Sequence, residues 1–122
     1  MRIAFVASNP SHLGTESPAK QNLYRWIKKL NLKVGYSFFN VSNSVTPDNR
    51  PLKKSEYELL RLKEDLRGIR KVVALGATAA DALSQLGIAC FELPHPSPKN
   101  RVLNDKCAIE TTLEECRLYL ED

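Results

Sequence analysis

The chain has 122 residues, and 18 Lys and Arg against 14 Asp and Glu give it a formal net charge of +4. This length is typical of one domain, so we expect residues 1–122 to form a single domain. With 43% hydrophobic and 26% charged residues, the composition excludes disorder, collagen and coiled coil, and no window reaches the ~18 apolar residues of a membrane span. Because the opening residues are also too short for a signal peptide, we expect a cytoplasmic protein. The three cysteines are odd in number, widely spaced and without a Cys-x-x-Cys pair, so we expect no disulfide framework and no metal, and we expect no cofactor.

The first elements are a buried strand and an amphipathic helix. An apolar run at residues 3–7 stops at Ser8–Pro10, which is typical of a buried strand that ends in a turn. From Ala19 onward, apolar residues recur at the spacing of one helix face, and Lys20 is left for the outer face. The apolar positions of this helix are Leu23, Trp26, Ile27 and Leu30.

The middle of the chain predicts a second strand, a long loop and a second helix. Residues 34–41 are rich in β-branched and aromatic side chains and predict the strand. The Ser-, Asn- and Pro-rich loop at residues 42–51 is long for a compact domain, so it is a candidate wall of a site. Ser55 and Glu58 have the spacing of a capping box. The apolar positions that follow at helical spacing are Leu59, Leu62, Leu66 and Ile69.

The last part predicts two more strands, each followed by a helix. Residues 72–75 are a third buried strand, and a helix rich in small residues follows and ends at Gly87. Residues 88–93 predict a short fourth strand. Thr111 or Thr112 is expected to cap the final helix.

This alternation of strands and helices predicts a three-layer α/β/α sandwich with a central four-stranded parallel sheet. In such a sheet the ligand lies beyond the carboxyl ends of the strands. Asn9, Asn40 and His95 each come directly after a predicted strand. Their amide and imidazole groups suit the binding of a flat hydrogen-bonding group and the holding of a water more than covalent catalysis.

Basic residues stand in two loops that are rich in Pro, Asn and Ser. One loop contains Arg50 and Lys53, and the other contains the run Lys99–Arg101. Loops of this composition could meet phosphates, and an ordinary solvated surface explains the same charges.

Four segments, in chain order, resemble the motifs of the uracil-DNA glycosylase superfamily. Residues 6–11 (Val-Ala-Ser-Asn-Pro-Ser) resemble the first motif, of the Gly-x-Asn-Pro-Gly type. Residues 39–41 with the loop 46–51 are similar to the strand-end Asn and the Pro/Arg loop of the family. Residues 72–80 are similar to its third strand and following helix, and residues 93–101 contain the second motif, His-Pro-Ser-Pro.

The resemblance implies a role for each strand-end residue. Asn9 matches the position that orients the water attacking C1′ of the sugar, in the mismatch-specific and single-strand-selective branches. Asn40 matches the residue that reads the Watson–Crick edge of a flipped pyrimidine, and His95 matches the residue that hydrogen-bonds O2 of the departing base. The other residues expected around the base are Ser8, Pro10 and His12, and His12, Tyr24 or Phe39 is expected to stack on it or close the pocket.

The resemblance also implies contacts with the DNA backbone, with Ser97 at the flanking phosphate. The further residues expected on the DNA are Lys99, Asn100, Arg101, Arg50 and Lys53. We therefore expect a monomeric DNA glycosylase that acts on uracil or a modified pyrimidine, with no membrane or metal partner. Two other interpretations stay open: a nucleic-acid-binding protein of this fold without catalysis, and a hydrolase or transferase acting on a modified base or nucleotide.

Overall fold

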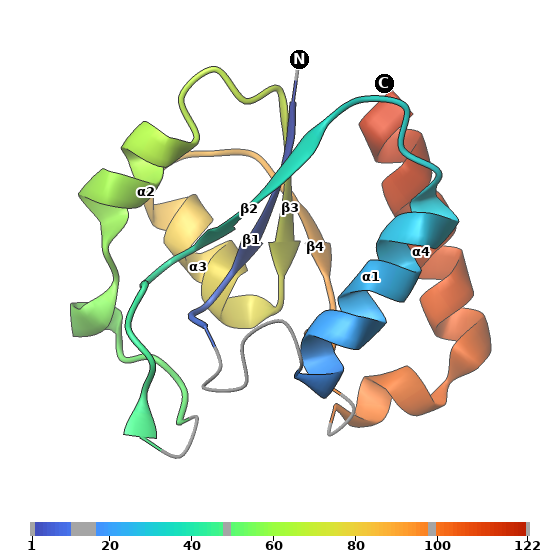
Figure 1. Cartoon of the computed structure of the whole chain (residues 1–122), viewed down its shortest axis with the longest axis horizontal. Coiled ribbons are helices and arrows are strands. Elements are labelled where there is room, and N and C mark those ends of the chain that lie inside the picture. Colours follow the sequence, from blue (N-terminus) through green and yellow to red (C-terminus); the bar gives the residue numbers. More distant parts are fainter. Residues whose placement is uncertain (1, 11–16, 48–49, 98–99, 122) are drawn as a thin grey trace.

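A computed structural model of the chain describes residues 2–10, 17–47, 50–97 and 100–121. Its sheet has the strand order β2-β1-β3-β4, and every neighbouring pair is parallel (Figure 1). The strands are β1 (Ile3–Ala7), β2 (Tyr36–Asn40), β3 (Lys71–Leu75) and β4 (Phe91–Leu93). The helices are α1 (Pro18–Leu30), α2 (Leu59–Asp65), α3 (Ala77–Gln85) and α4 (Lys106–Glu121), with short 3₁₀ helices η3 (Lys54–Glu56) and η4 (Arg101–Asn104).

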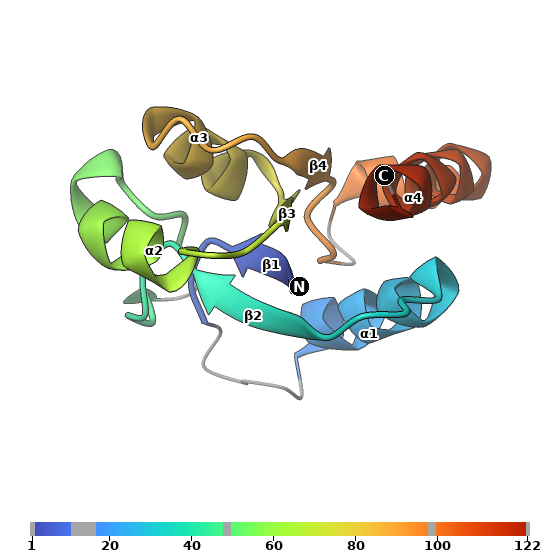
Figure 2. The same cartoon turned by 90° about the horizontal axis from the view of Figure 1, so that it is seen from above.

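The helices form two layers, one on each face of the sheet. Figure 2 shows α1 and α4 on one side of the strands and α2 and α3 on the other. The predicted three-layer α/β/α sandwich with a four-stranded parallel sheet is thereby confirmed. None of the helices in the described ranges is long and apolar enough to cross a bilayer.

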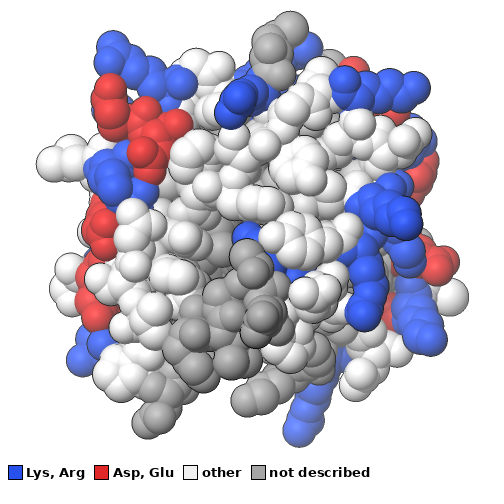
Figure 3. All heavy atoms as spheres, viewed as in Figure 1, with Lys and Arg blue, Asp and Glu red and all other residues white. Residues whose placement is uncertain are grey.

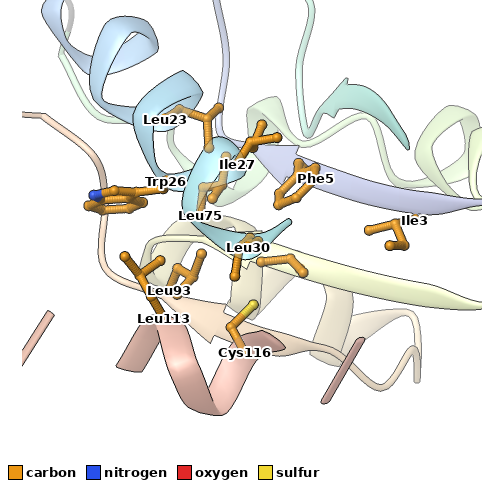
Figure 4. Packing of buried hydrophobic residues seen from close by; sticks show 11 residues of the cluster. Ile3, Phe5, Leu23, Trp26, Ile27, Leu30, Leu75, Leu93, Leu113 and Cys116 are labelled. Carbon is orange, nitrogen blue, oxygen red and sulfur yellow. The ribbon is translucent and has the colours of Figure 1, made fainter. Parts of the chain in front are cut away.

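Each face of the sheet has its own core, because side chains alternate along a strand. Ile3 and Phe5 of β1 point toward α1 and α4, whereas Ala4 and Val6 point toward α2 and α3. Burial on both faces explains why β1 is a continuous apolar run. Figure 4 shows the first core, in which Phe5 and Leu75 from the sheet lie close to Leu23 and Ile27 from α1.

Helix α1 begins and ends at residues suited to those positions. The Ser17 side chain accepts a hydrogen bond from the Lys20 backbone N–H, and Pro18 occupies the first turn, where its missing donor costs nothing. Asn31 ends the helix with φ of 51°, a left-handed conformation that Asn tolerates. These residues therefore define where helix α1 begins and ends.

The helix starts predicted at Ser55 and at Thr111 or Thr112 are both wrong. Ser55 lies inside η3, and the Glu58 carboxylate accepts hydrogen bonds from Ser42 and Asn43 instead of capping α2. The final helix starts at Lys106, and Asp105 accepts from the Ala108 N–H, so Thr111 and Thr112 lie within α4. The Glu58 carboxylate is occupied by Ser42 and Asn43, and at the start of α4 Asp105 provides the cap in place of Thr111 or Thr112. The second and fourth strands are also shorter than predicted.

Candidate functional site

A cavity of about 280 Å³ opens at the carboxyl ends of the strands. Its volume is close to the lower end of small-molecule pockets, which hold roughly 300–1,000 Å³, so it suits a group the size of a nucleobase. Five of the residues predicted from the sequence line it together: Asn9, Pro10, Phe39, Asn40 and His95. Its apolar walls come from Phe5, Leu23, Phe38, Phe39 and Leu75.

His95 is held by hydrogen bonds on both its ring and its backbone. Its Nδ1 accepts from the Ser97 backbone N–H at 3.1 Å, and its carbonyl accepts from the Asn100 side chain at 3.1 Å. Because Nδ1 is an acceptor, the neutral ring carries its proton on Nε2. Although part of His95 is exposed, desolvation by the surrounding protein lowers the pKa of its ring below the ordinary value. At neutral pH His95 is therefore an uncharged hydrogen-bond donor.

Gly76 lets the His95 ring approach the sheet. Gly76 connects β3 to α3 with φ of +97°, and its N–H donates to Leu93 O at 2.8 Å, just before the histidine. A Cβ placed on Gly76 would come within 3.2 Å of the His95 Cβ and 3.4 Å of its Cδ2. Gly76 is therefore required both for its backbone conformation and for the space that His95 occupies.

A short hydrogen-bond relay fixes the orientation of the Asn9 amide. Its Nδ2 donates to Ser44 O at 3.2 Å and to Thr46 Oγ1 at 3.4 Å, and the Thr46 hydroxyl donates in turn to Arg50 O at 2.6 Å. Its Oδ1 accepts from the Ser8 hydroxyl at 3.0 Å. A carbonyl oxygen has two lone pairs, so Oδ1 can accept a further hydrogen bond from a water.

Asn40 is held by its backbone and leaves its amide for a ligand. Arg61 donates to the carbonyl of Asn40 at 2.5 Å and to that of Val41 at 3.3 Å, and Glu58 pairs with Arg61 at 3.0 Å. Within the described part of the chain, the Asn40 side-chain amide makes no hydrogen bond. These contacts position an unused donor and acceptor on the cavity wall.

The remaining predicted residues lie around this cavity or elsewhere. Ser8 bonds to Asn9 from behind and does not line the cavity, and Ser97 and Asn100 support His95. Arg50 forms a bidentate pair with Glu56 at 2.7 and 2.8 Å, so its charge is already partnered. Lys53 and Arg101 are exposed. His12 and Lys99 lie outside the described residues.

Sequence reasoning missed three residues of this site. Lys20 lines the cavity and does not lie on the outer face of α1, although it precedes Leu23 by three residues and so belongs to the same stripe. Phe38 lines the cavity and packs edge-on against Tyr24, which does not reach the cavity. Thr46 is buried in the long loop, and the sequence marked this loop as a candidate wall of the site without singling out Thr46.

The arrangement presents a hydrogen-bonding edge and a place for water, between apolar walls. No group of three His, Cys, Asp or Glu side chains suited to a metal ion occurs among the residues that the structure covers. A neutral imidazole and two amides can hold a flat heterocycle and orient a water beside it.

Comparison with known proteins gives the family. The family model of the uracil DNA glycosylase superfamily matches residues 1–117. A search of curated proteins found no match. Membership supports a glycosylase-type function and implies a DNA substrate. With the matching α/β fold and nearly the whole sequence covered, the chain belongs to the uracil-DNA glycosylase superfamily.

Proposed function

We propose that this protein is a DNA glycosylase that hydrolyses the N-glycosidic bond of uracil or a modified pyrimidine. The supporting observation is that Asn9, Asn40 and the neutral His95, which follow three different strands, line one cavity of nucleobase size. A base inside a duplex cannot reach such a cavity, so the target nucleotide must be extruded from the stack.

Each of the three residues has a role that its environment permits. Cleavage of the bond between C1′ and N1 builds positive charge on the sugar and negative charge on the base. The Nε2–H of His95 donates to O2 of the base, where that negative charge develops. Asn9 Oδ1 accepts from the attacking water, and the Asn40 amide pairs with the Watson–Crick edge. The apolar walls exclude bulk water and strengthen these interactions.

The test is release of bases from defined oligonucleotides. The purified protein is incubated with DNA containing uracil, a thymine mismatch or hydroxymethyluracil, and alkali then reveals abasic sites. We expect cleavage of at least one substrate and a loss of about 10²-fold or more in rate for Asn9→Ala and for His95→Ala, since each removes a preorganised group from the reacting centre.

The control is Asn104→Ala, an exposed asparagine of η4 outside the cavity, which should cleave at the wild-type rate. An unchanged rate for Asn9→Ala or His95→Ala would refute the role of that residue. DNA binding without release of any base would overturn the proposal and favour a nucleic-acid-binding protein without catalysis.

A further inference from the structure

Lys20 brings a cation into the cavity wall. It lies in the first turn of α1, is half-buried, and lines the same cavity as Asn9, Asn40 and His95. Its Nζ lies 3.7 Å from the centre of the Phe38 ring and 5.8 Å from that of Tyr24. The ammonium group thus lies over the face of Phe38, which itself lines the cavity.

Among the residues that the structure describes, none provides Lys20 with a negative charge. Across the described ranges, no carboxylate forms an ion pair with it or lines the cavity, and the first turn of α1 contains no acidic residue. The positive end of the helix dipole points to the same region and disfavours a cation there. Burial accordingly lowers the pKa of Lys20. An anionic ligand would stabilise such a half-buried cation by supplying the opposite charge.

In the described part of the chain, few titratable groups face this ammonium. His95 at the end of β4 contributes a neutral ring, and Tyr24 on α1 contributes an aromatic face. The neighbouring strand β2 contributes Phe38, which carries no charge. Within the described part of the site, Lys20 is therefore the source of positive charge for whatever occupies the cavity.

We propose that Lys20 is the charge partner of the pyrimidine anion that leaves during base release. This inference rests on the proposed glycosylase reaction. As the bond between C1′ and N1 breaks, its electron pair stays on the base, the water oxygen bonds to C1′, and a proton of that water passes to solvent. His95 donates one hydrogen bond to the resulting anion, and Lys20 contributes a full opposite charge in a cavity with apolar walls.

A binding experiment tests the contact without requiring catalysis. Free uracil and free 5-fluorouracil, a stronger acid because fluorine withdraws electrons, are titrated into the wild-type protein between pH 6 and 10. We expect 5-fluorouracil to bind about tenfold more tightly at the pH where it alone is ionised. Its affinity should rise as the base loses its proton and fall as Lys20 loses its own.

Two variants and one control decide the assignment. Lys20→Met keeps the approximate length of the side chain without its charge, so it should lose most of the preference and keep only the part that His95 contributes, whereas Lys20→Arg should keep more of it. Lys28→Met changes an exposed lysine of the same helix and should behave as the wild type. Equal affinities in the wild type, absence of measurable 5-fluorouracil binding, or a preference that is as large in Lys20→Met as in the wild type would each overturn the proposal.

A kinetic experiment tests the role of Lys20 in the reaction. In oligonucleotides, Lys20→Met should slow release of uracil by about 10²-fold. It should slow release of 5-fluorouracil less, because a better leaving group needs less stabilisation. Equal slowing of both bases would contradict a role at the leaving group. If the wild type released no base but the binding preference depended on Lys20, the glycosylase reaction would be overturned and the anion contact upheld.

Discussion

At the scale of single residues, the site depends on neighbouring groups that hold the two catalytic candidates, Asn9 and His95, in position. Gly76 leaves room for the His95 ring, and the Ser97 N–H determines which ring nitrogen carries the proton. Thr46 gives the Asn9 amide its direction by accepting on one side and donating to Arg50 O on the other. These groups affect the reaction by positioning Asn9 and His95, and they need no contact with the substrate to do so.

Gly76→Ala should damage both stability and the site. The positive φ of +97° is strained for alanine, and its Cβ would press on His95 at 3.2 Å. We expect the free energy of unfolding to fall by about 1–3 kcal/mol in urea titrations, and base release to fall with it at temperatures where the variant is folded.

Gly68→Ala is the matched control for Gly76→Ala. Gly68 also has a positive φ, of +79°, but no atom lies within 4 Å of the added Cβ. Gly68→Ala should therefore lose stability and keep the wild-type rate of base release. A wild-type rate in Gly76→Ala would show that His95 tolerates displacement.

At the scale of elements, the segment between β2 and α2 is held by ion pairs that reach back to the end of β2. Glu58 accepts from Ser42 and Asn43 and pairs with Arg61, which donates to the Asn40 carbonyl. On the other side of the cavity, Asn22 of α1 donates to Pro96 O at 3.0 Å. The strand ends that present Asn40 and His95 are therefore braced by neighbouring elements.

The pair between Arg50 and Glu56 predicts a specific loss of stability in acid. The hydrogen bond from Arg50, supported by the Lys53 N–H, lowers the pKa of Glu56 from 4.5 to about 2. Stability from this depressed pKa is present above about pH 4.5 and is lost as the pH falls toward 2. The difference in unfolding free energy between the wild type and Glu56→Gln should therefore shrink over this range in urea titrations.

Glu64→Gln provides the control for the acid experiment. Glu64 pairs with Arg67 on the surface, where the side chains are 71% and 79% exposed, and such pairs contribute little to stability. The variant should differ little from the wild type at any pH. If the difference in unfolding free energy between the wild type and Glu56→Gln stayed constant between pH 5 and 2.5, the assigned pairing would be contradicted.

At the scale of the whole molecule, charge is distributed unevenly over the face that Figure 3 shows. Figure 3 shows a mostly uncharged middle, Lys and Arg over the α1 side, and mixed acidic and basic side chains over the α2 side. The chain carries a net charge of +4. The net charge alone therefore does not identify which basic residues would meet DNA.

Lys53 and Arg101, which are exposed and are expected on the DNA, lead to a prediction about the salt dependence of DNA binding. If Lys53 and Arg101 each contact a phosphate, Lys53→Gln and Arg101→Gln should each reduce the slope of log K against log salt by about 0.9. The measurement is a fluorescence anisotropy titration at several salt concentrations. Arg67→Gln is the control, because Arg67 precedes β3 at the opposite edge of the sheet and pairs with Glu64. An unchanged slope in Lys53→Gln or Arg101→Gln would remove that residue from the DNA interface.

By itself, the sequence determined the succession of strands and helices along the chain and the edge of the sheet at which the site lies. Continuous apolar runs predict strands buried on both faces, and parallel strands bring the residues that follow them to one edge, so Asn9, Asn40 and His95 could be expected to meet. Those inferences need only local pattern and the geometry common to all parallel sheets.

Only the tertiary structure decided the strand order β2-β1-β3-β4, the partners of Glu56 and Glu58, and the entry of Lys20 into the cavity. The bonds from Asn9 to Ser44 and Thr46 join residues 35 and 37 positions apart. Residues so far apart in the chain meet through the packing of whole elements, and spacing along the sequence carries no information about such contacts. The sequence therefore locates the site, and the fold decides how its groups are oriented and charged.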